Sequence, residues 1–317
     1  MSGRDGPRLD YRRVGIYLTI AFGLAWGTVL VLYLTGGLVH SPVLIPGTPV
    51  TLALILVPTL FMWSPALAHI ITRLVTGEGW HDLWLRPDLG RVRRPLLASW
   101  AGTVLCVLAG GLVFFAVFPG AFDPSMSALR ERAGGQLPTS PSASAAILLL
   151  LALLVLFIAP LFNSLFTFGE EFGWRAYLQP HLLALGSRRA VVITGLIWGA
   201  WHWPLTAMGH NYGTRYASAP WLGMLAMTWF TLVVGIFLGY LTLRAGSVWP
   251  AVLGHGTLNA VAGLPILVSA GGISPVLGPH PAGLFGSAGF TAAALWILLT
   301  PRSMLRGTQS RQTGPTT

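Results

Sequence analysis

Two adjacent glutamates lie inside a long apolar stretch of this chain. Glu170 and Glu171 are the only acidic residues after Glu131. An ionised carboxylate is costly in an apolar environment, so the pair needs a role that offsets the cost of its burial. Arg175 follows Glu171 at the i,i+4 position, which predicts an ion pair that supports the site structurally. Glu170 points about 100° away from that face and is predicted to be unpaired and to face a cavity.

Three more polar side chains are predicted to lie at a similar depth on neighbouring helices. His202 lies 13 residues beyond Arg189, and His255 lies 11 residues beyond Arg244. These separations correspond to roughly 20 Å and roughly 16 Å of helix, well inside a bilayer. Asn259 follows His255 at i,i+4 and shares its helical face.

Glu170 can meet these residues only if its helix is still inside the membrane at that point. This requirement predicts a span from about 153 to 182, within which Pro160 becomes an internal kink.

This set of side chains suits the hydrolysis of a peptide bond by activated water. Glu170 would act as the general base, and His202 would help to bind and orient the same water. His255 and Asn259 would donate hydrogen bonds to the developing oxyanion.

A metal mechanism uses the same residues. Glu170, His202 and His255 match the ligand count of a catalytic site for Zn²⁺ or another divalent metal with an open position for water. The sequence alone does not decide between a metal-dependent and a metal-free reaction. It contains no HExxH helix and no Gly-x-Ser-x-Gly elbow.

Each polar residue also has a simpler interpretation. A lone His or Asn in a span more often bridges helices, and a glutamate pair can relay protons in a transporter. Trp198, Trp201 and Trp203 are interpreted as packing and interfacial anchors. Because Glu170, His202, His255 and Asn259 are all predicted at compatible depth, a catalytic site is favoured over these interpretations. The alternative is a non-catalytic membrane protein such as a bacteriocin-immunity factor or a proton-linked transporter.

The composition predicts a polytopic membrane protein. The chain is 54% hydrophobic and 9% charged, with a mean hydropathy of +0.69, whereas soluble domains carry about 25% charged residues. The net charge of +10 does not predict nucleic-acid binding, because the arginines lie between apolar runs. All 19 basic residues are Arg, which suggests a GC-rich bacterial genome and hence a bacterial plasma membrane. The single cysteine, Cys106, is interpreted as a packing residue.

Eight apolar runs predict an all-α fold with about eight spans and both termini in the cytoplasm. Only Arg130, Arg132 and Arg215 fall on the outer side, leaving 16 arginines inside or in the glutamate motif. Residues 1–13 are predicted to form a cytoplasmic tail, 14–300 a single transmembrane domain with its catalytic core at about 150–262, and 301–317 a disordered cytoplasmic tail. The predicted spans are approximately 14–34, 50–74, 96–118, 153–182, 190–208, 220–243, 248–270 and 284–299.

Three motifs on separate spans resemble those of the CPBP family, the CAAX protease and bacteriocin-processing (Abi) group of intramembrane endopeptidases related to the type II CAAX prenyl endopeptidase. They are Glu170-Glu171-x-x-x-Arg175, Trp198-x-x-x-His202 and His255-x-x-x-Asn259. The resemblance implies an eight-helix core with Glu170 as the catalytic glutamate, His202 as its water-activating partner, and His255 with Asn259 as transition-state stabilisers. It also implies a membrane-associated peptide or protein substrate. The family usually has Phe at the position of Trp198.

Overall fold

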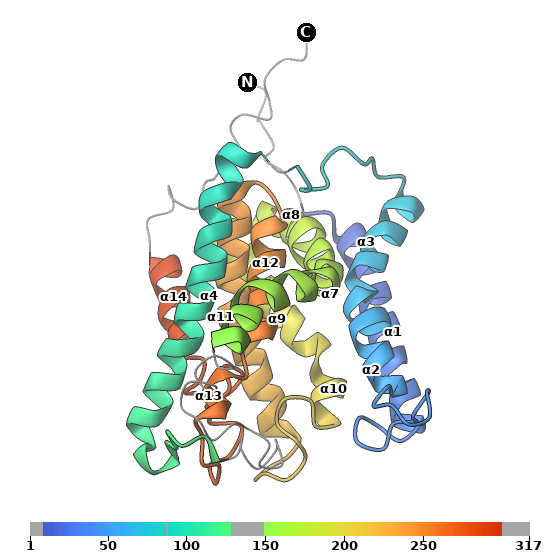
Figure 1. The fold of residues 1–317 in the computed structure, drawn as a ribbon. Helices are drawn as coiled ribbons and strands as arrows, with labels where there is room; N and C mark the ends of the chain where they lie inside the picture. Colours follow the sequence, from blue (N-terminus) through green and yellow to red (C-terminus); the bar gives the residue numbers. More distant parts are fainter. Residues whose placement is uncertain (1–8, 87, 128–148, 300–317) are drawn as a thin grey trace.

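The computed structural model describes residues 9–86, 88–127 and 149–299. Across these ranges the regular elements are helices, and strand-like pairing is limited to the isolated bridges Val43–Thr51 and Phe122–Ser269. The helices form one bundle, with most of the connecting loops gathered at its two ends (Figure 1). The predicted all-α fold is therefore confirmed.

Within the described ranges, six helical segments are long and apolar enough to cross a bilayer: Tyr11–Leu34, Leu52–Thr76, Leu89–Val117, Leu149–Leu185, Trp221–Ala245 and Trp249–Leu267. They confirm a multi-pass membrane protein. Two further predicted spans correspond to shorter helices, α9 (Ser187–Trp201) and α14 (Ala288–Leu299). The total of eight spans and the cytoplasmic placement of both termini stay predictions. Most of the two predicted tails lies outside the described residues, as do Arg130 and Arg132, which are predicted to lie on the outer side.

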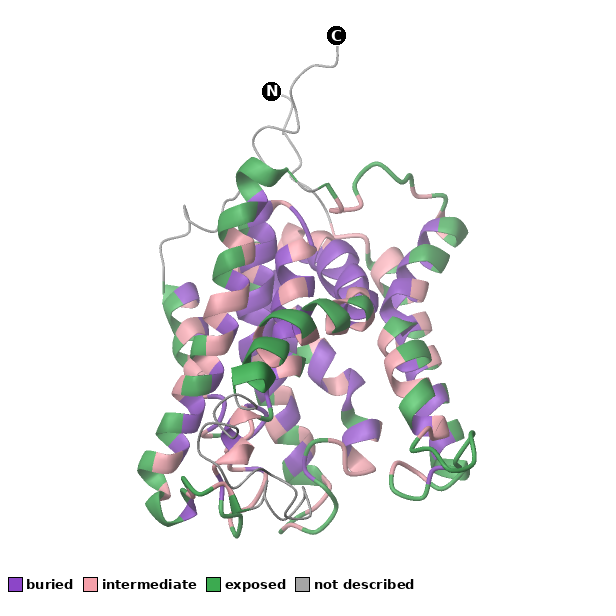
Figure 2. Ribbon diagram, in the orientation of Figure 1, coloured by how far each residue is buried: buried purple, intermediate pink, exposed green. Residues whose placement is uncertain are grey.

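Many helix residues on the outside of the bundle are exposed (Figure 2), and they include large apolar residues, as expected of helices that contact lipid. Leu105 and Leu112 of α4 (Leu89–Val117) are exposed, as are Leu161 and Leu165 of α7 (Ala159–Gly173). The interior is rich in aromatic residues, and its largest fully buried side chains include Tyr17, Phe61, Trp174, Tyr177, Trp198 and Trp201. The buried aromatic core is therefore surrounded by aliphatic helix faces.

The first span, α1 (Tyr11–Leu34), packs against the second, which is not a continuous α-helix. The second span comprises α2 (Leu52–Leu56), a π-helical turn η1 (Val57–Phe61) and α3 (Met62–Thr76). The π turn contains Pro58, whose missing N–H interrupts the helical hydrogen bonds. The interruption at Pro58 therefore takes the form of a π-helical turn.

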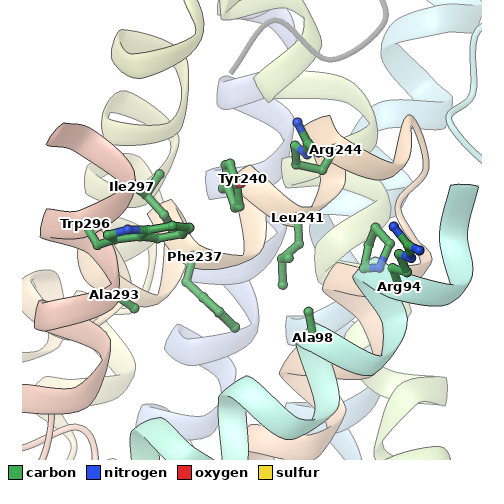
Figure 3. A pocket seen from close by; sticks show the side chains of 10 residues that line it. Arg94, Ala98, Phe237, Tyr240, Leu241, Arg244, Ala293, Trp296 and Ile297 are labelled. Carbon is green, nitrogen blue, oxygen red and sulfur yellow. The ribbon is translucent and has the colours of Figure 1, made fainter. Parts of the chain in front are cut away.

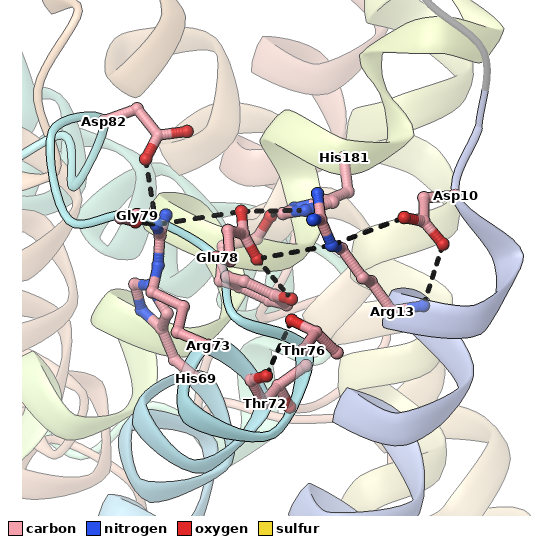
Figure 4. Close-up of polar contacts among 11 residues, drawn as sticks. Asp10, Arg13, His69, Thr72, Arg73, Thr76, Glu78, Gly79, Asp82 and His181 are labelled. Atoms are coloured by element: carbon pink, nitrogen blue, oxygen red, sulfur yellow. Dashed lines mark hydrogen bonds and ion pairs between the residues drawn. The ribbon is translucent and has the colours of Figure 1, made fainter.

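A polar network ties the end of α3 to the helix that carries the glutamates (Figure 4). The guanidinium of Arg73 is 1% exposed and lies 2.9 Å from Oδ1 of Asp82 and 3.7 Å from Oε1 of Glu78. Glu78 also accepts a 3.1 Å hydrogen bond from the Tyr177 hydroxyl and lies 3.4 Å from Nε2 of His181. Because Tyr177 and His181 follow α7 in the chain, the network fixes one end of that helix against α3.

Two glycines let α7 approach α3 closely. A Cβ atom on Gly169 would lie 2.7 Å from Cγ of Trp63, and one on Gly173 would lie 2.3 Å from Cβ of Pro65. Small residues spaced four apart allow helix backbones to pack at short distance in membranes. Glu170 and Glu171 lie between these two glycines, so the close contact sets their position relative to α3.

The span that contains the glutamates is longer than predicted, extending over 149–185 rather than about 153–182. It includes two π-helical turns, η3 (Leu154–Ile158) before Pro160 and η4 (Trp174–Leu178) directly after α7. The first is the expected discontinuity at Pro160. The second was not predicted, and it changes the helical phase immediately after the glutamates.

Side-chain to backbone hydrogen bonds join α4, α7 and α12 (Trp249–Val261), as is common between membrane helices. Thr167 of α7 donates to the carbonyl of Val252 at 3.0 Å, and Ser99 of α4 donates to that of Pro250. Because Gly254 has no side chain, its Cα can lie next to Ser99. The helix bearing His255 is thereby held between α4 and α7.

Candidate active site

His202 lies at a break between two helices. α9 ends at Trp201, and the short α10 (Trp203–Ala207) begins immediately after His202, with Pro204 in its first turn. The two helices cover nearly all of the predicted span over 190–208, and the break at His202 was not predicted. Pro204 can begin a helix but disrupts one that continues through it. The His202 side chain is buried, and its Nδ1 lies 2.9 Å from the carbonyl oxygen of Trp198.

Glu170 is buried on α7, and it has a hydrogen-bond partner. The indole Nε1 of Trp198 donates to Oε2 of Glu170 at 2.7 Å. Among the described residues this indole, and not a charged group, is the hydrogen-bond partner given to Glu170, so Trp198 does more than pack between helices. The Trp198 ring also lies against the Arg175 guanidinium, 4.4 Å from ring centroid to Cζ. This residue therefore connects both halves of the first motif.

Glu171 contacts two partners. Nη1 of Arg175 donates to Oε1 of Glu171 at 2.8 Å, which is the predicted i,i+4 pair. Nδ1 of His255 lies 2.8 Å from the same oxygen. Both carboxylate and guanidinium are fully buried, so each charge needs the other to offset its desolvation. The bond to His255 was not predicted, and it gives Glu171 a second role in orienting a site residue.

The four predicted catalytic residues line one cavity of about 220 Å³: Glu170, His202, His255 and Asn259. Asn259 is the exposed member of the set, and the other three are buried. Glu171 and Arg175 do not line the cavity and lie behind it. The predicted division between a cavity-facing Glu170 and a supporting Glu171 thus agrees with the arrangement of the side chains.

Two histidines that the sequence did not single out also line this cavity. His210 follows α10, and His280 lies in the segment before α14. Burial lowers the pKa of each to about 4, so both are neutral at pH 7. The backbone N–H of Ala282 donates to Nδ1 of His280, which leaves the proton on Nε2. The loop positions of these histidines gave no sign that they reach the cavity.

The predicted metal ligands do not come together as a ligand set. Among the described residues, no three His, Cys, Asp or Glu side chains form a group that could hold a metal ion. In His202 and His255 the Nδ1 atoms already face Trp198 and Glu171, and Oε2 of Glu170 faces Trp198. A metal held by Glu170, His202 and His255 therefore stays a prediction, and no step below uses one.

The fold and the cavity define a class: a multi-pass membrane protein in which a carboxylate, several imidazoles and an amide face one cavity among its helices. Comparison with protein families gives this class a name. Residues 145–261 match the family described as Rce1-like, type II CAAX prenyl endopeptidase Rce1-like. The match includes all three motifs, and over these residues it confirms the predicted resemblance to the CAAX protease (CPBP) family. No curated protein matches the chain.

Proposed function

We propose that this CAAX-type protease is an intramembrane endopeptidase that hydrolyses a peptide bond of a lipidated or membrane-tethered peptide or protein. The observation that carries the proposal is that Glu170 and His202 face one cavity, each with one polar atom engaged by Trp198. The engaged atoms fix the orientation of both side chains, and Oε1 of Glu170 and Nε2 of His202 remain for water.

The tautomer of His202 supports a role in binding that water. The carbonyl of Trp198 can only accept, so Nδ1 of His202 carries the hydrogen. In the neutral ring Nε2 is then an acceptor. Glu170 and His202 can each accept one hydrogen of a single water, which leaves an oxygen lone pair for the substrate carbonyl.

His255 and Asn259 supply donors for the oxyanion. The Asn259 amide is a donor in any protonation state, whereas His255 can donate from Nε2 only as an imidazolium, since Nδ1 faces Glu171. With His255 protonated, the two carboxylates of Glu170 and Glu171 balance the two cations of His255 and Arg175. Burying these four charged side chains with no net charge costs less desolvation free energy than burying them with an excess charge.

The proposed reaction transfers one proton through Glu170. The water oxygen bonds to the carbonyl carbon while Glu170 takes a water proton, and the carbonyl oxygen becomes the anion held by His255 and Asn259. The intermediate then expels the amine by breaking the C–N bond, and Glu170 returns its proton to the leaving nitrogen. A carboxyl group and an amine result, and the enzyme regains its starting charges.

The decisive test uses purified protein in bilayer nanodiscs with a library of lipidated and membrane-tethered peptides, read by mass spectrometry. Wild type is expected to cleave members of the library, and Glu170→Gln is expected to cleave none while remaining folded. Wild type that leaves every peptide intact, together with an unchanged host phenotype for Glu170→Gln, would overturn the proposal. Proton-coupled movement of a solute without cleavage would instead support the transporter alternative.

Elemental analysis of the same preparations tests for the divalent metal. The metal-free proposal expects no stoichiometric Zn²⁺ or other divalent ion in active wild type, and activity that survives dialysis against a chelator. A stoichiometric metal that is lost in the His202→Ala, His255→Ala double variant would favour the metal mechanism over the one given above.

The proposed setting is the plasma membrane of a bacterium. The lipid bilayer supplies the surroundings of the spans and delivers substrates that are themselves anchored to it. The proposal assigns no nucleic-acid partner, and the basic charge is taken to orient the helices.

A further inference from the structure

A second cavity lies between α4, α11 (Trp221–Ala245) and α14, and it shares no lining residue with the candidate active site. Its volume is about 340 Å³. Figure 3 shows the side chains that α4, α11 and α14 contribute to it. The proposed protease chemistry makes no use of it.

One end of this cavity is basic. Arg94 lies near the start of α4, and Arg244 is the penultimate residue of α11. Because α4 and α11 run in opposite directions, these two ends meet at the same end of the bundle, and both arginines line the cavity. Both residues are exposed. By the arginine distribution, this end is predicted to be the cytoplasmic one.

The rest of the cavity is apolar. Ala98 of α4, Phe237 and Leu241 of α11, and Ala293 and Ile297 of α14 line it. In Figure 3 the two arginines lie on one side of Leu241, and Phe237 and Ala293 extend away from them.

Two aromatic residues border the apolar part. Tyr240 and Trp296 pack edge to face, with ring centroids 6.2 Å apart, and Tyr and Trp are typical of the level of lipid headgroups. The cavity thus changes from basic to apolar along its length.

We propose that this cavity binds an acidic phospholipid, with the phosphate between Arg94 and Arg244 and one acyl chain along the apolar part. A soluble anion would pair with the arginines but would leave the apolar lining without a contact. An uncharged hydrocarbon would contact the apolar lining but would not pair with the two guanidinium groups. An acidic phospholipid carries both a negative phosphate and an apolar chain, and basic pockets between membrane helices on the cytoplasmic side suit such headgroups. The inference is independent of the proposed peptidase activity.

The test measures lipid binding in nanodiscs of phosphatidylcholine that contain increasing amounts of phosphatidylglycerol, with retained lipids counted by native mass spectrometry. Wild type is expected to retain one phosphatidylglycerol in preference to phosphatidylcholine. The affinity of the Arg94→Gln, Arg244→Gln double variant for phosphatidylglycerol is expected to fall by roughly tenfold or more.

The matched control is Arg86→Gln, Arg93→Gln, which removes two exposed arginines near α4 that do not line the cavity. It is expected to bind as wild type does. Ala98→Phe leaves the charge unchanged and fills the apolar part, so it is expected to displace the acyl chain and lower retention to the level of the Arg94, Arg244 variant.

Three results would overturn the proposal: equal retention of the two lipids by wild type, equal losses in the test and control double variants, or unchanged retention in Ala98→Phe. Glycerol phosphate added as a water-soluble competitor distinguishes a lipid site from a simple phosphate site. The proposal expects millimolar glycerol phosphate to leave the lipid bound. Displacement at that concentration would assign the site to a soluble anion instead.

Discussion

The indole Nε1 of Trp198 on α9 donates a 2.7 Å hydrogen bond to Oε2 of Glu170 on α7, and the two residues lie 28 positions apart in the chain. The same residue offers its backbone carbonyl to Nδ1 of His202. Trp198 therefore orients both groups that are proposed to hold the attacking water. A Phe at this position would keep the backbone contact and lose the contact with the carboxylate.

Trp198→Phe is expected to lower kcat by roughly ten- to a hundredfold with little change in KM. The substitution removes one hydrogen bond to a charged group, worth about 1.5–3 kcal/mol, and leaves the proposed base less well oriented. Steady-state kinetics on a cleaved peptide in nanodiscs measure the effect.

The control for that change is Trp203→Phe, which removes the 2.9 Å hydrogen bond from another indole to Thr228 outside the cavity. Its kcat is expected to stay within about twofold of wild type, because substitutions outside the core and the active site usually have small effects. Equal kcat values for Trp198→Phe and wild type would show that the indole contact does not orient the base.

Replacing the two glutamates separately is expected to affect different properties. Glu170→Gln is expected to abolish cleavage and to leave the melting temperature near that of wild type, because the amide oxygen can still accept from Trp198. Glu171→Gln is expected to lower stability by about 3–5 kcal/mol, because it leaves the buried Arg175 without its counter-charge. Thermal unfolding in detergent, monitored by a fluorescent probe, compares the two.

Arg175→Gln combined with Glu171→Gln serves as the control, since it removes both buried charges together. The double variant is expected to be more stable than Glu171→Gln alone, because no uncompensated charge remains. A double variant that is less stable than either single variant would contradict the ion-pair account.

Local spacing was enough to predict the pairing of Glu171 with Arg175 and the separate orientation of Glu170. Both follow from the period of one helix. The bonds from His255 to Glu171 and from Trp198 to Glu170 join residues 84 and 28 positions apart. They depend on how α7, α9 and α12 pack, which no local pattern encodes. His210 and His280 were missed for the same reason, since both reach the cavity from loops.

The ends of the spans were harder to predict than their existence. α4 begins at Leu89 and not at the predicted 96, and it includes Arg91, Arg93 and Arg94 in its first turns. Long Arg side chains can extend toward the interface while their stems lie along the helix, so charge did not mark the helix boundary. The break at His202 was missed because an apolar run shows no sign of it except Pro204.

Asn259→Ala is expected to lower kcat by about 10²–10³-fold with an unchanged melting temperature. The amide is proposed to donate to the oxyanion, and loss of one such donor has this size of effect. The side chain is exposed to the cavity, so its removal leaves the packing of α12 intact. Asn259→Asp, which keeps the size and replaces the donor by an acceptor, is expected to be at least as impaired. Normal kcat in either variant would remove Asn259 from the proposed mechanism.

Gly173→Ala is expected to destabilise the protein and to reduce activity together, because the added methyl would meet the Pro65 backbone at 2.5 Å and push α7 away from α3. Overpacking of this kind costs about 1–3 kcal/mol. Gly27→Ala is the matched control: it also lies in a membrane-spanning helix, and a Cβ atom there meets nothing within 4 Å. The control is expected to be neutral or about 0.5 kcal/mol more stable. If both variants melt at the wild-type temperature, the glycine contact between α3 and α7 does not set the position of the glutamates.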